Sequence, residues 1–402
     1  MALPTADGAT AAAIGPLPLR RRWPDSIRLR DSTLLLVLAA IWTFFYFTTG
    51  GTFLTQRNLV LLALQTSIVS LAAISAVMLI VTRNFDLSVG SAVALVGVVV
   101  AVLTVKLGLG TVPAVAAGIA AGVVMGAWQG LWVTRLGVSS FIVTLAGMLY
   151  FRGISMIVTN GETVAPVPES LTDLATGFLA PLPSAALVVA VFLAFAAVQT
   201  LWARRARRLG VIDRLGPELI RSVVPALATA LAVIWLASWQ GIPILVLIVA
   251  GAAIAAEIVM RRTRFGLQLY AIGGNPEAAR LSGVKVGRTI FVNFVIAGLA
   301  YGITGVALVA RVSGAVGGSA GLFLELDAIA AAIIGGTALQ GGKGRVLGAL
   351  VGALLMGSLN NGMSLMDVPT FYQEAARGVI LLLAVAVDQF SRRRTRLARS
   401  GG

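Results

Sequence analysis

Apolar runs of membrane-spanning length alternate with short polar breaks along almost the whole chain. A transmembrane helix needs about 20 mostly apolar residues, and the runs between breaks approach that length. They fall at 33–50, 58–81, 86–105, 112–134, 138–158, 184–203, 222–240, 242–260, 290–312, 325–340, 346–363 and 375–391. The pattern predicts an all-α protein, a polytopic bundle of ten to twelve transmembrane helices.

Two of these runs are weaker than the others. The run at 325–340 is short and begins with Glu325 and Asp327, and the run at 86–105 opens with Asp86. Charges and irregular backbone are tolerated at membrane depth only where protein or a hydrated cavity shields them. We therefore expect each of these two segments to be a re-entrant or broken helix.

Composition supports a lipid environment. The chain has 402 residues, of which 58% are hydrophobic and 12% charged, whereas soluble domains carry about 25% charged residues. The 45 glycines suit membrane helices that approach each other through small residues. Cysteine and histidine are absent, which excludes disulfides and histidine-based acid–base or metal sites. We expect no metal site and no bound cofactor.

The net charge of +15 has two explanations, nucleic-acid binding and the enrichment of Lys and Arg on the cytoplasmic side of membrane proteins. If the N-terminus is inside and the spans alternate, 26 of the 31 basic residues fall on the inner side. The longest outer loop, 160–183, holds three acids and no base. We therefore predict both termini inside, with cytoplasmic segments at 1–32 and 392–402 flanking a transmembrane domain at 33–391.

The glycine-rich stretch GGTALQGGKGR at 335–345 is superficially similar to a nucleotide-binding phosphate loop. Gly344 occupies the position where Ser or Thr would bind magnesium, the preceding glycine has the wrong spacing, and no strand is predicted before it. We interpret the stretch as a tight inner turn that carries Lys343 and Arg345. The sequence thus indicates neither an ATP site nor catalytic residues in this chain.

Polar side chains inside the spans are candidates for a solute path. An amide buried without a partner costs a few kcal/mol, so these residues either bridge helices or line a hydrated route, and both interpretations stay open. Amides and hydroxyls suit a neutral, hydroxyl-rich solute. The candidates for a translocation path are Gln65, Ser70, Asn293 and Asn360.

By contrast, the sequence indicates few ionisable residues inside the spans. Glu257 is the one carboxylate that lies well inside an apolar run, and Arg261 is close enough for the two to pair at the membrane interface. Proton-coupled carriers use ionisable groups within the membrane. The sequence therefore disfavours a proton-coupled carrier.

One polar interruption, GGNPEAARLSGVKVG at 273–287, has the signals of a short helix. Asn275 is a favourable N-cap, Pro276 fits the first turn, and Glu277 complements the helix N-terminus. Gly283 is placed to end the helix. We predict a helix of about two turns on the inner side. A helix with two caps suits a rigid docking element for a partner, and an ordered interfacial loop is the alternative.

Three blocks of sequence resemble the permease subunits of ABC sugar importers of the ribose, arabinose and xylose type. The blocks are TRNFDLSVGSAVAL at 82–95, AIGGNPEAARLSGVKV at 271–286 and the segment 325–363. The resemblance extends over about residues 55–390. An insertion near 184–240 adds two spans, keeps the parity of the topology and makes the chain closest to the longer, xylose-type branch.

The resemblance implies a transport permease without its own ATP site. A separate cytoplasmic ABC ATPase, an extracytoplasmic sugar-binding protein and a second copy of the permease would be its partners in a bacterial inner membrane. The family motif corresponds to Asp86, Leu87, Ser88, Val89 and Gly90. The ATPase-coupling helix corresponds to Gly274, Asn275, Pro276, Glu277, Ala278, Ala279, Arg280, Leu281, Ser282 and Gly283. The substrate would be a monosaccharide, a pentose such as xylose.

Two other classes of function are consistent with a membrane bundle. A secondary active carrier for a small neutral solute would need intramembrane charge pairs and no ATPase. An integral-membrane enzyme, such as a lipid transferase, would need His, Asp or Glu to converge at one membrane face. The absence of histidine and the scattered acids disfavour the enzyme.

Overall fold

The structure, a computed structural model, describes residues 25–208 and 215–380, together with 382 and 386. The helices are α1 (Asp25–Thr48), α2 (Gln56–Val81), α3 (Val89–Ala101), α4 (Thr111–Thr134), α5 (Ser140–Thr159), α6 (Glu169–Thr176), α7 (Pro181–Arg208), α8 (Leu215–Ala237), α9 (Ile244–Arg262), α10 (Arg264–Gly274), α11 (Pro276–Leu281), α12 (Val286–Val312), α13 (Leu324–Ile334) and α14 (Val346–Leu365). A 3-10 turn, η1 (Thr52–Leu54), precedes α2, and a π-helical turn, η2 (Val102–Lys106), extends α3. Residues 370–380 are also helical.

The all-α, polytopic fold is confirmed. Eight of the described helices are long and apolar enough to cross a membrane: α2, α3 with η2, α4, α5, α7, α9, α12 and α14. The shorter apolar segments Leu34–Thr48 and Ala226–Ala237 lie within α1 and α8. The predicted segment 392–402, most of 1–32 and the end of the last predicted span lie outside the described residues.

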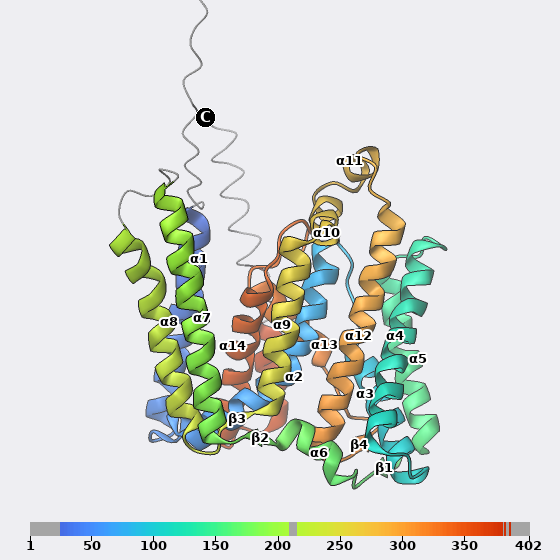
Figure 1. The fold of residues 1–402 in the computed structure, drawn as a ribbon. Coiled ribbons are helices and arrows are strands. Elements are labelled where there is room, and N and C mark those ends of the chain that lie inside the picture. The colour runs from blue at the N-terminus through green and yellow to red at the C-terminus, as the bar shows by residue number, and fades with distance from the viewer. Residues whose placement is uncertain (1–24, 209–214, 381, 383–385, 387–402) are drawn as a thin grey trace, which may run out of the picture.

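The weak span at 325–340 is short, as expected, whereas the one at 86–105 reaches 18 residues when α3 is taken together with η2. Helix α13 has 11 residues, which gives a length of about 16 Å, roughly half of the hydrocarbon core of a bilayer. Helix α3 begins only after the non-helical residues 83–88, which descend from the end of α2 into the bundle (Figure 1). Both short helices therefore begin inside the bundle.

Successive helices run in alternating directions (Figure 1). Helix α11 and the C-terminal ends of α7 and α9 lie at one end of the bundle, and α6 and the short strands lie at the other. The first end carries Arg83 and Arg135, which follow α2 and α4. It is called the inner end below, and the opposite one the outer end.

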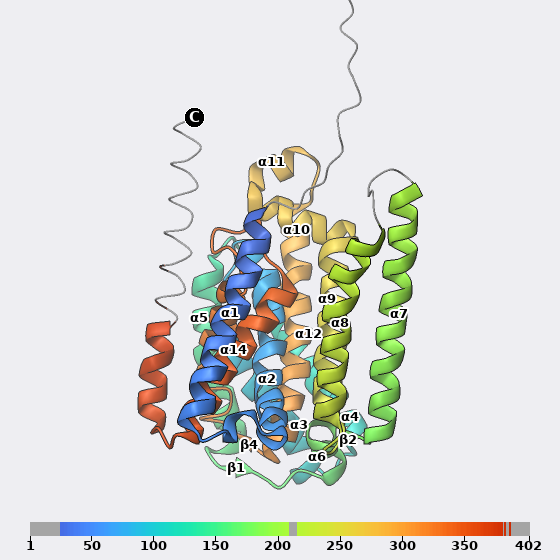
Figure 2. The same cartoon turned by 90° about the vertical axis from the view of Figure 1, so that its left-hand side faces the viewer.

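Helices α2 and α3 occupy the centre of the bundle, whereas α7 lies at its margin. Of the most apolar 18-residue window, 89% of the residues are buried in α2 and only 6% in α7. Helix α8 is fastened to the bundle at its outer end, where Gln56 Nε2 donates to the Trp235 carbonyl at 2.8 Å and to Ser238 Oγ at 3.2 Å. The pair α7–α8 thus forms a peripheral hairpin (Figure 2).

Two short antiparallel ladders join the outer connections. Strand β2 (Phe178–Leu179) pairs with β3 (Ile242–Pro243), directly before and after the α7–α8 hairpin. The predicted insertion near 184–240 corresponds to this helical hairpin, and its status as two added spans stays a prediction. The second ladder pairs β1 (Thr163–Val164) with β4 (Ala315–Val316).

Glycines allow α4 and α12 to pack backbone against backbone. A Cβ on Gly122 would lie 2.5 Å from the Gly298 carbonyl oxygen, and one on Gly126 would lie 2.8 Å from Gly298 Cα. Neither position accepts a side chain without a shift of the helices. Close approach through small residues, expected from the glycine content, is confirmed here.

Candidate coupling helix and membrane interior

Helix α11 has the predicted caps. The Asn275 Oδ1 atom accepts from the backbone amides of Glu277 at 3.0 Å and Ala278 at 3.1 Å, and Pro276 is in the first turn. Gly283 follows the helix with φ of 84°, a conformation that glycine adopts without strain. The helix has six residues, Pro276–Leu281, and projects from the bundle at the inner end (Figure 1).

The surface of α11 is almost entirely exposed. Only Ala279 is buried, with 5% of its surface exposed, whereas Leu281 is 81% exposed. Glu277 and Arg280 form an exposed ion pair of 3.0 Å. A large apolar side chain on a polar helix outside the membrane-spanning segments, flanked by both charges, is typical of a contact surface for another protein. The exposure of Leu281 is a signal that the sequence interpretation did not use.

The Asp86-to-Gly90 motif organises the start of α3. Asp86 Oδ1 accepts from the Ser88 amide at 2.7 Å and from Ser88 Oγ at 2.6 Å. Tyr301 of α12 donates to Asp86 Oδ2, and Gln129 of α4 donates to Ser88 Oγ at 2.5 Å. Leu87 is partly buried, and the polar members of this network are buried. The motif thus joins the start of α3 to two neighbouring helices.

The starts of α3 and α13 meet inside the bundle. A Cβ added to Gly90 would collide with the Gly321 carbonyl and the Glu325 carboxylate, and a Cβ on Gly321 would lie 2.5 Å from the Gly90 carbonyl oxygen. Val89 is also fully buried at this point. Because helix N-termini carry partial positive charge, the two helix starts provide a favourable environment for the carboxylates of Asp86 and Glu325.

The interior contains more ionisable groups than the sequence indicated. The expectation that buried ionisable residues are scarce is therefore wrong. Asp86, Glu325 and Asp327 are all buried. Their burial could not be predicted from the sequence, because these acids lie at the beginnings of apolar runs. An acid at such a position also suits an exposed helix N-terminus. Glu257 does pair with Arg261, at 2.5 Å, as predicted.

Arginines from other helices balance this interior charge. Arg152 of α5 donates to the carbonyls of Gly317 at 3.3 Å and Ala320 at 2.6 Å. Arg377 donates through Nε to Asn360 Oδ1 at 2.9 Å and lies 3.9 Å from the Asp327 carboxylate. These contacts link the outer connection before α13 to α5, and α13 to the helix at 370–380.

The four candidate path residues do not form one site. Asn293 is fully buried and donates to the Met78 carbonyl at 2.9 Å, near the inner end of α2. Asn360 contacts Arg377 near the outer end of α14. Ser70 is buried and Gln65 is partly buried in the middle of α2. Asn293 therefore bridges helices, and a role in a solute path stays a prediction for all four residues.

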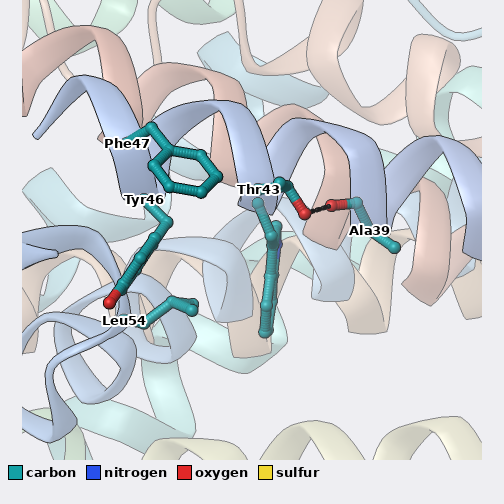
Figure 3. A pocket seen from close by; sticks show the side chains of 6 residues that line it. Ala39, Thr43, Tyr46, Phe47 and Leu54 are labelled. Carbon is teal, nitrogen blue, oxygen red and sulfur yellow. Dashed lines mark hydrogen bonds between the residues drawn. The ribbon is translucent and has the colours of Figure 1, made fainter.

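One hollow lies on the outside of the bundle. It has a volume of about 400 Å³, it is lined by Ala39, Trp42, Thr43, Tyr46, Phe47 and Leu54, and Figure 3 shows these side chains on α1 and beside η1. Phe47 is 75% exposed. Aromatic side chains of this kind gather at membrane interfaces, so the hollow suits a lipid chain better than a polar solute.

A second cavity has three charged side chains among mostly apolar walls. It measures about 110 Å³ and lies between α13, α14 and the helix at 370–380. Its lining includes Asp327, Glu374 and Arg377, together with apolar side chains such as Phe323 and Met356. This volume has room for about three or four water molecules. The cavity is lined by Arg377, which contacts the candidate path residue Asn360.

This bundle, with two helices that begin in its interior and its projecting capped helix, belongs to a family of membrane permeases. Residues 58–385 match the family described as the permease component of the branched-chain amino acid transport system. The match covers well over half of the chain and shows that the chain is a member of this family. The relatives with known names are transport permease components.

Two groups of named relatives are similar over nearly their whole length. The xylose transport system permease protein XylH of Escherichia coli strain K12 is 42% identical over 373 residues, which cover 92% of this chain and 94% of the relative. The protein of the same name from Haemophilus influenzae is 40% identical over 374 residues, 92% of this chain and 98% of the relative. The ribose import permease protein RbsC of Escherichia coli strain K12 is 36% identical, over 88% of this chain and 91% of the relative. No solved structure matches the chain.

Proposed function

We propose that this chain is the membrane-spanning subunit of an ABC importer, which moves a monosaccharide into the cytoplasm with energy from a separate ATPase subunit. The observation that carries the proposal is the identity of 42% with a xylose permease over 92% of the chain. A pentose such as xylose is the proposed substrate. The proposed setting is a bacterial inner membrane.

The exposed helix α11 supports docking of the ATPase. It projects from the inner end, and its caps hold it in one conformation. Leu281 offers an apolar contact, and Glu277 and Arg280 offer charges beside it. On this proposal, closure of the ATPase dimer displaces α11, and the bundle alternates between outward-open and inward-open states.

The outer end is the proposed site of solute delivery. An extracytoplasmic binding protein would dock on α6 and the two short ladders, and a second permease copy would complete the path. The cavity lined by Asp327 and Arg377 is next to Asn360, which accepts from Arg377, and these polar groups support entry of a hydroxyl-rich solute there. Lipid surrounds the remaining apolar surface.

The test of this proposal combines uptake with subunit association. The chain is produced with the ATPase and binding protein encoded beside it, and uptake of labelled xylose, ribose and arabinose is measured. Glu277→Lys and Leu281→Glu both change exposed side chains, so the fold is retained while association with the ATPase is lost. Glu162→Lys is the matched control, since it makes the same charge change in the outer loop. ATPase association that is equal in all variants contradicts the docking role of α11.

A proton-coupled secondary carrier is the second candidate, because the interior contains Asp86, Glu325 and Asp327. Intramembrane carboxylates are typical of proton relays. The two functions differ in their energy source. An ABC importer loses uptake when the ATPase gene is deleted, whereas a proton-coupled carrier loses uptake when a protonophore collapses the proton gradient and ATP is maintained.

A further inference from the structure

Two inner turns of the bundle meet at the C-terminal end of α10. The first turn follows α2 and contains Arg83. Its Nε atom donates to the Gly273 carbonyl at 2.8 Å, and its Nη2 atom donates to the Gly274 carbonyl at 2.7 Å. These are the last residues of α10. A helix C-terminus has unsatisfied carbonyls and partial negative charge, so the guanidinium satisfies both carbonyls and complements the helix dipole.

The second turn, residues 335–345, joins α13 to α14 and reaches the same point. The Gly342 amide donates to the Val81 carbonyl at 2.8 Å. The Tyr270 hydroxyl of α10 donates to the Gly344 carbonyl at 2.8 Å. Three segments that are distant in sequence are therefore tied together through main-chain carbonyls.

Glycines make this junction tight. A Cβ on Gly273 would collide with the Val81 carbonyl and would lie 3.0 Å from Gly342 Cα, and a Cβ on Gly341 would lie 2.6 Å from the Arg83 side chain. By contrast, a Cβ on Gly287 at the start of α12 meets no atom within 4 Å. At Gly273 and Gly341, the contact between the two turns and α10 thus leaves no space for a side chain.

Each turn leads directly to a helix that starts inside the bundle. The residues after Arg83 lead to Asp86 and α3, and the turn at 335–345 is continuous with α13. The starts of α3 and α13 are held together where Gly90 contacts Gly321. On the opposite side, only Asn275 separates α10 from α11. A continuous set of close contacts thus extends from the exposed helix α11 to the middle of the membrane.

We propose that this junction is a rigid latch, which transmits the displacement of α11 to α3 and α13, and that Arg83 is the positioning residue that holds it. The inner latch is defined by Arg83, Tyr270, Gly273, Gly342 and Gly344. The inference rests on the proposed function, since it assumes that an ATPase docks on α11. Without the latch, α11 still binds the ATPase, but its movement no longer opens the interior.

The first experiment separates coupling from association. Arg83→Ala is purified with the ATPase and tested for sugar uptake through the binding protein. We expect normal co-purification, a KM for uptake within about twofold of the wild type and a maximal rate lowered about tenfold. ATP hydrolysis is expected to lose its stimulation by the sugar-loaded binding protein. Arg83→Lys retains the charge but replaces the fixed fork of guanidinium donors with a single ammonium group, so it is expected to be intermediate.

Matched controls come from the same end of the bundle. Arg135→Ala removes an exposed arginine that follows α4 and is expected to leave uptake unchanged. Gly273→Ala inserts a Cβ into the latch and is expected to reduce the uptake rate, whereas Gly287→Ala adds the same group in open space. Wild-type uptake by Arg83→Ala overturns the latch. Failure of the wild-type chain to co-purify with any ATPase instead overturns the proposed function.

A distance measurement tests the latch without disturbing it. The chain has no cysteine, so Leu267→Cys in α10 can be combined with Lys343→Cys in the second turn, and both sites are exposed. We expect the distance between spin labels at these sites to stay constant when ATP binds. The distance from Leu267→Cys to Arg135→Cys, outside the latch, is expected to change. An equal change in both distances contradicts a rigid latch.

Discussion

Asn58 and Asn361 form a reciprocal amide pair that fastens α2 to α14 across 303 residues of sequence. Asn58 Nδ2 donates to Asn361 Oδ1 at 2.9 Å, and Asn361 Nδ2 donates to Asn58 Oδ1 at 3.1 Å. Both side chains are buried. Each amide therefore satisfies the other in a setting where water is excluded, so the pair acts as a unit.

This pair makes a prediction about non-additive stability. Either Asn58→Leu or Asn361→Leu leaves one buried amide without its partner, which costs about 1–3 kcal/mol. The double variant removes both polar groups, so its loss is expected to be smaller than the sum of the two single losses. Denaturant unfolding in detergent measures the three values. Simple additivity would show that the two amides do not interact.

The contact between α4 and α12 predicts a cost for a single methyl group. Alanine favours helix over glycine by about 1 kcal/mol, so Gly→Ala is stabilising wherever space allows. Gly122→Ala is expected to destabilise the protein by about 1–3 kcal/mol, because its Cβ meets the Gly298 backbone. Gly251→Ala in α9, where a Cβ meets no atom within 4 Å, is the matched control. Melting temperatures in detergent compare the two, and equal values would contradict the close packing.

The role of Asp86 can be divided into hydrogen bonding and charge. Asp86→Asn retains an acceptor for the Ser88 amide and a partner for the Tyr301 hydroxyl, so we expect stability within about 1 kcal/mol of the wild type. Asp86→Leu removes every one of these bonds and is expected to cost about 3 kcal/mol. The free energy of unfolding and sugar uptake are measured for both. A stable Asp86→Asn protein without uptake would show that the charge itself is required, as in the proton-coupled alternative.

Tyr270 provides a prediction about pH. Burial raises the pKa of the Tyr270 hydroxyl above its ordinary value of 10.0, so the protonated donor to Gly344 is favoured in the folded state. A raised pKa contributes stability that is fully present below the unfolded pKa and is lost as the pH rises through the folded pKa. The difference in stability between wild type and Tyr270→Phe is therefore expected to be constant between about pH 6 and 9 and to decrease above about pH 10.

That difference is measured by unfolding in detergent at a series of pH values. The titration of phenolate absorbance provides an independent check, since the component missing from Tyr270→Phe is expected to titrate above the ordinary tyrosine value of 10.0. A component that titrates below pH 10 would contradict burial of the hydroxyl.

Much of the architecture follows from local sequence. Membrane-spanning lengths, the position of the peripheral hairpin and the caps of α11 depend on composition over a few turns or on single residues such as Asn275 and Gly283. Even the short helix α13 was indicated, because acids stand at the beginning of its apolar run. These features need no knowledge of which helix neighbours which.

The features that escaped prediction are long-range pairs. Arg83 and Gly273 are 190 residues apart, and nothing local to either residue indicates the other. The burial of Glu325 likewise depends on the close approach of Gly90. Its position in the sequence is typical of an exposed helix N-terminus, but the neighbouring helix start encloses it. Asn293 is a further example, because the sequence cannot distinguish an amide that bridges helices from one that lines a path. Its bond to the Met78 carbonyl is visible only in the structure.

The ladder between β2 and β3 makes the α7–α8 pair a self-contained module. The chain departs from the bundle at Leu179 and returns at Ile242, and these two residues already face each other. A tight turn between them can replace both helices while the central contacts are preserved. Evolution can thus lengthen or shorten a protein of this architecture at its lipid-facing border, and the machinery at its centre is left untouched.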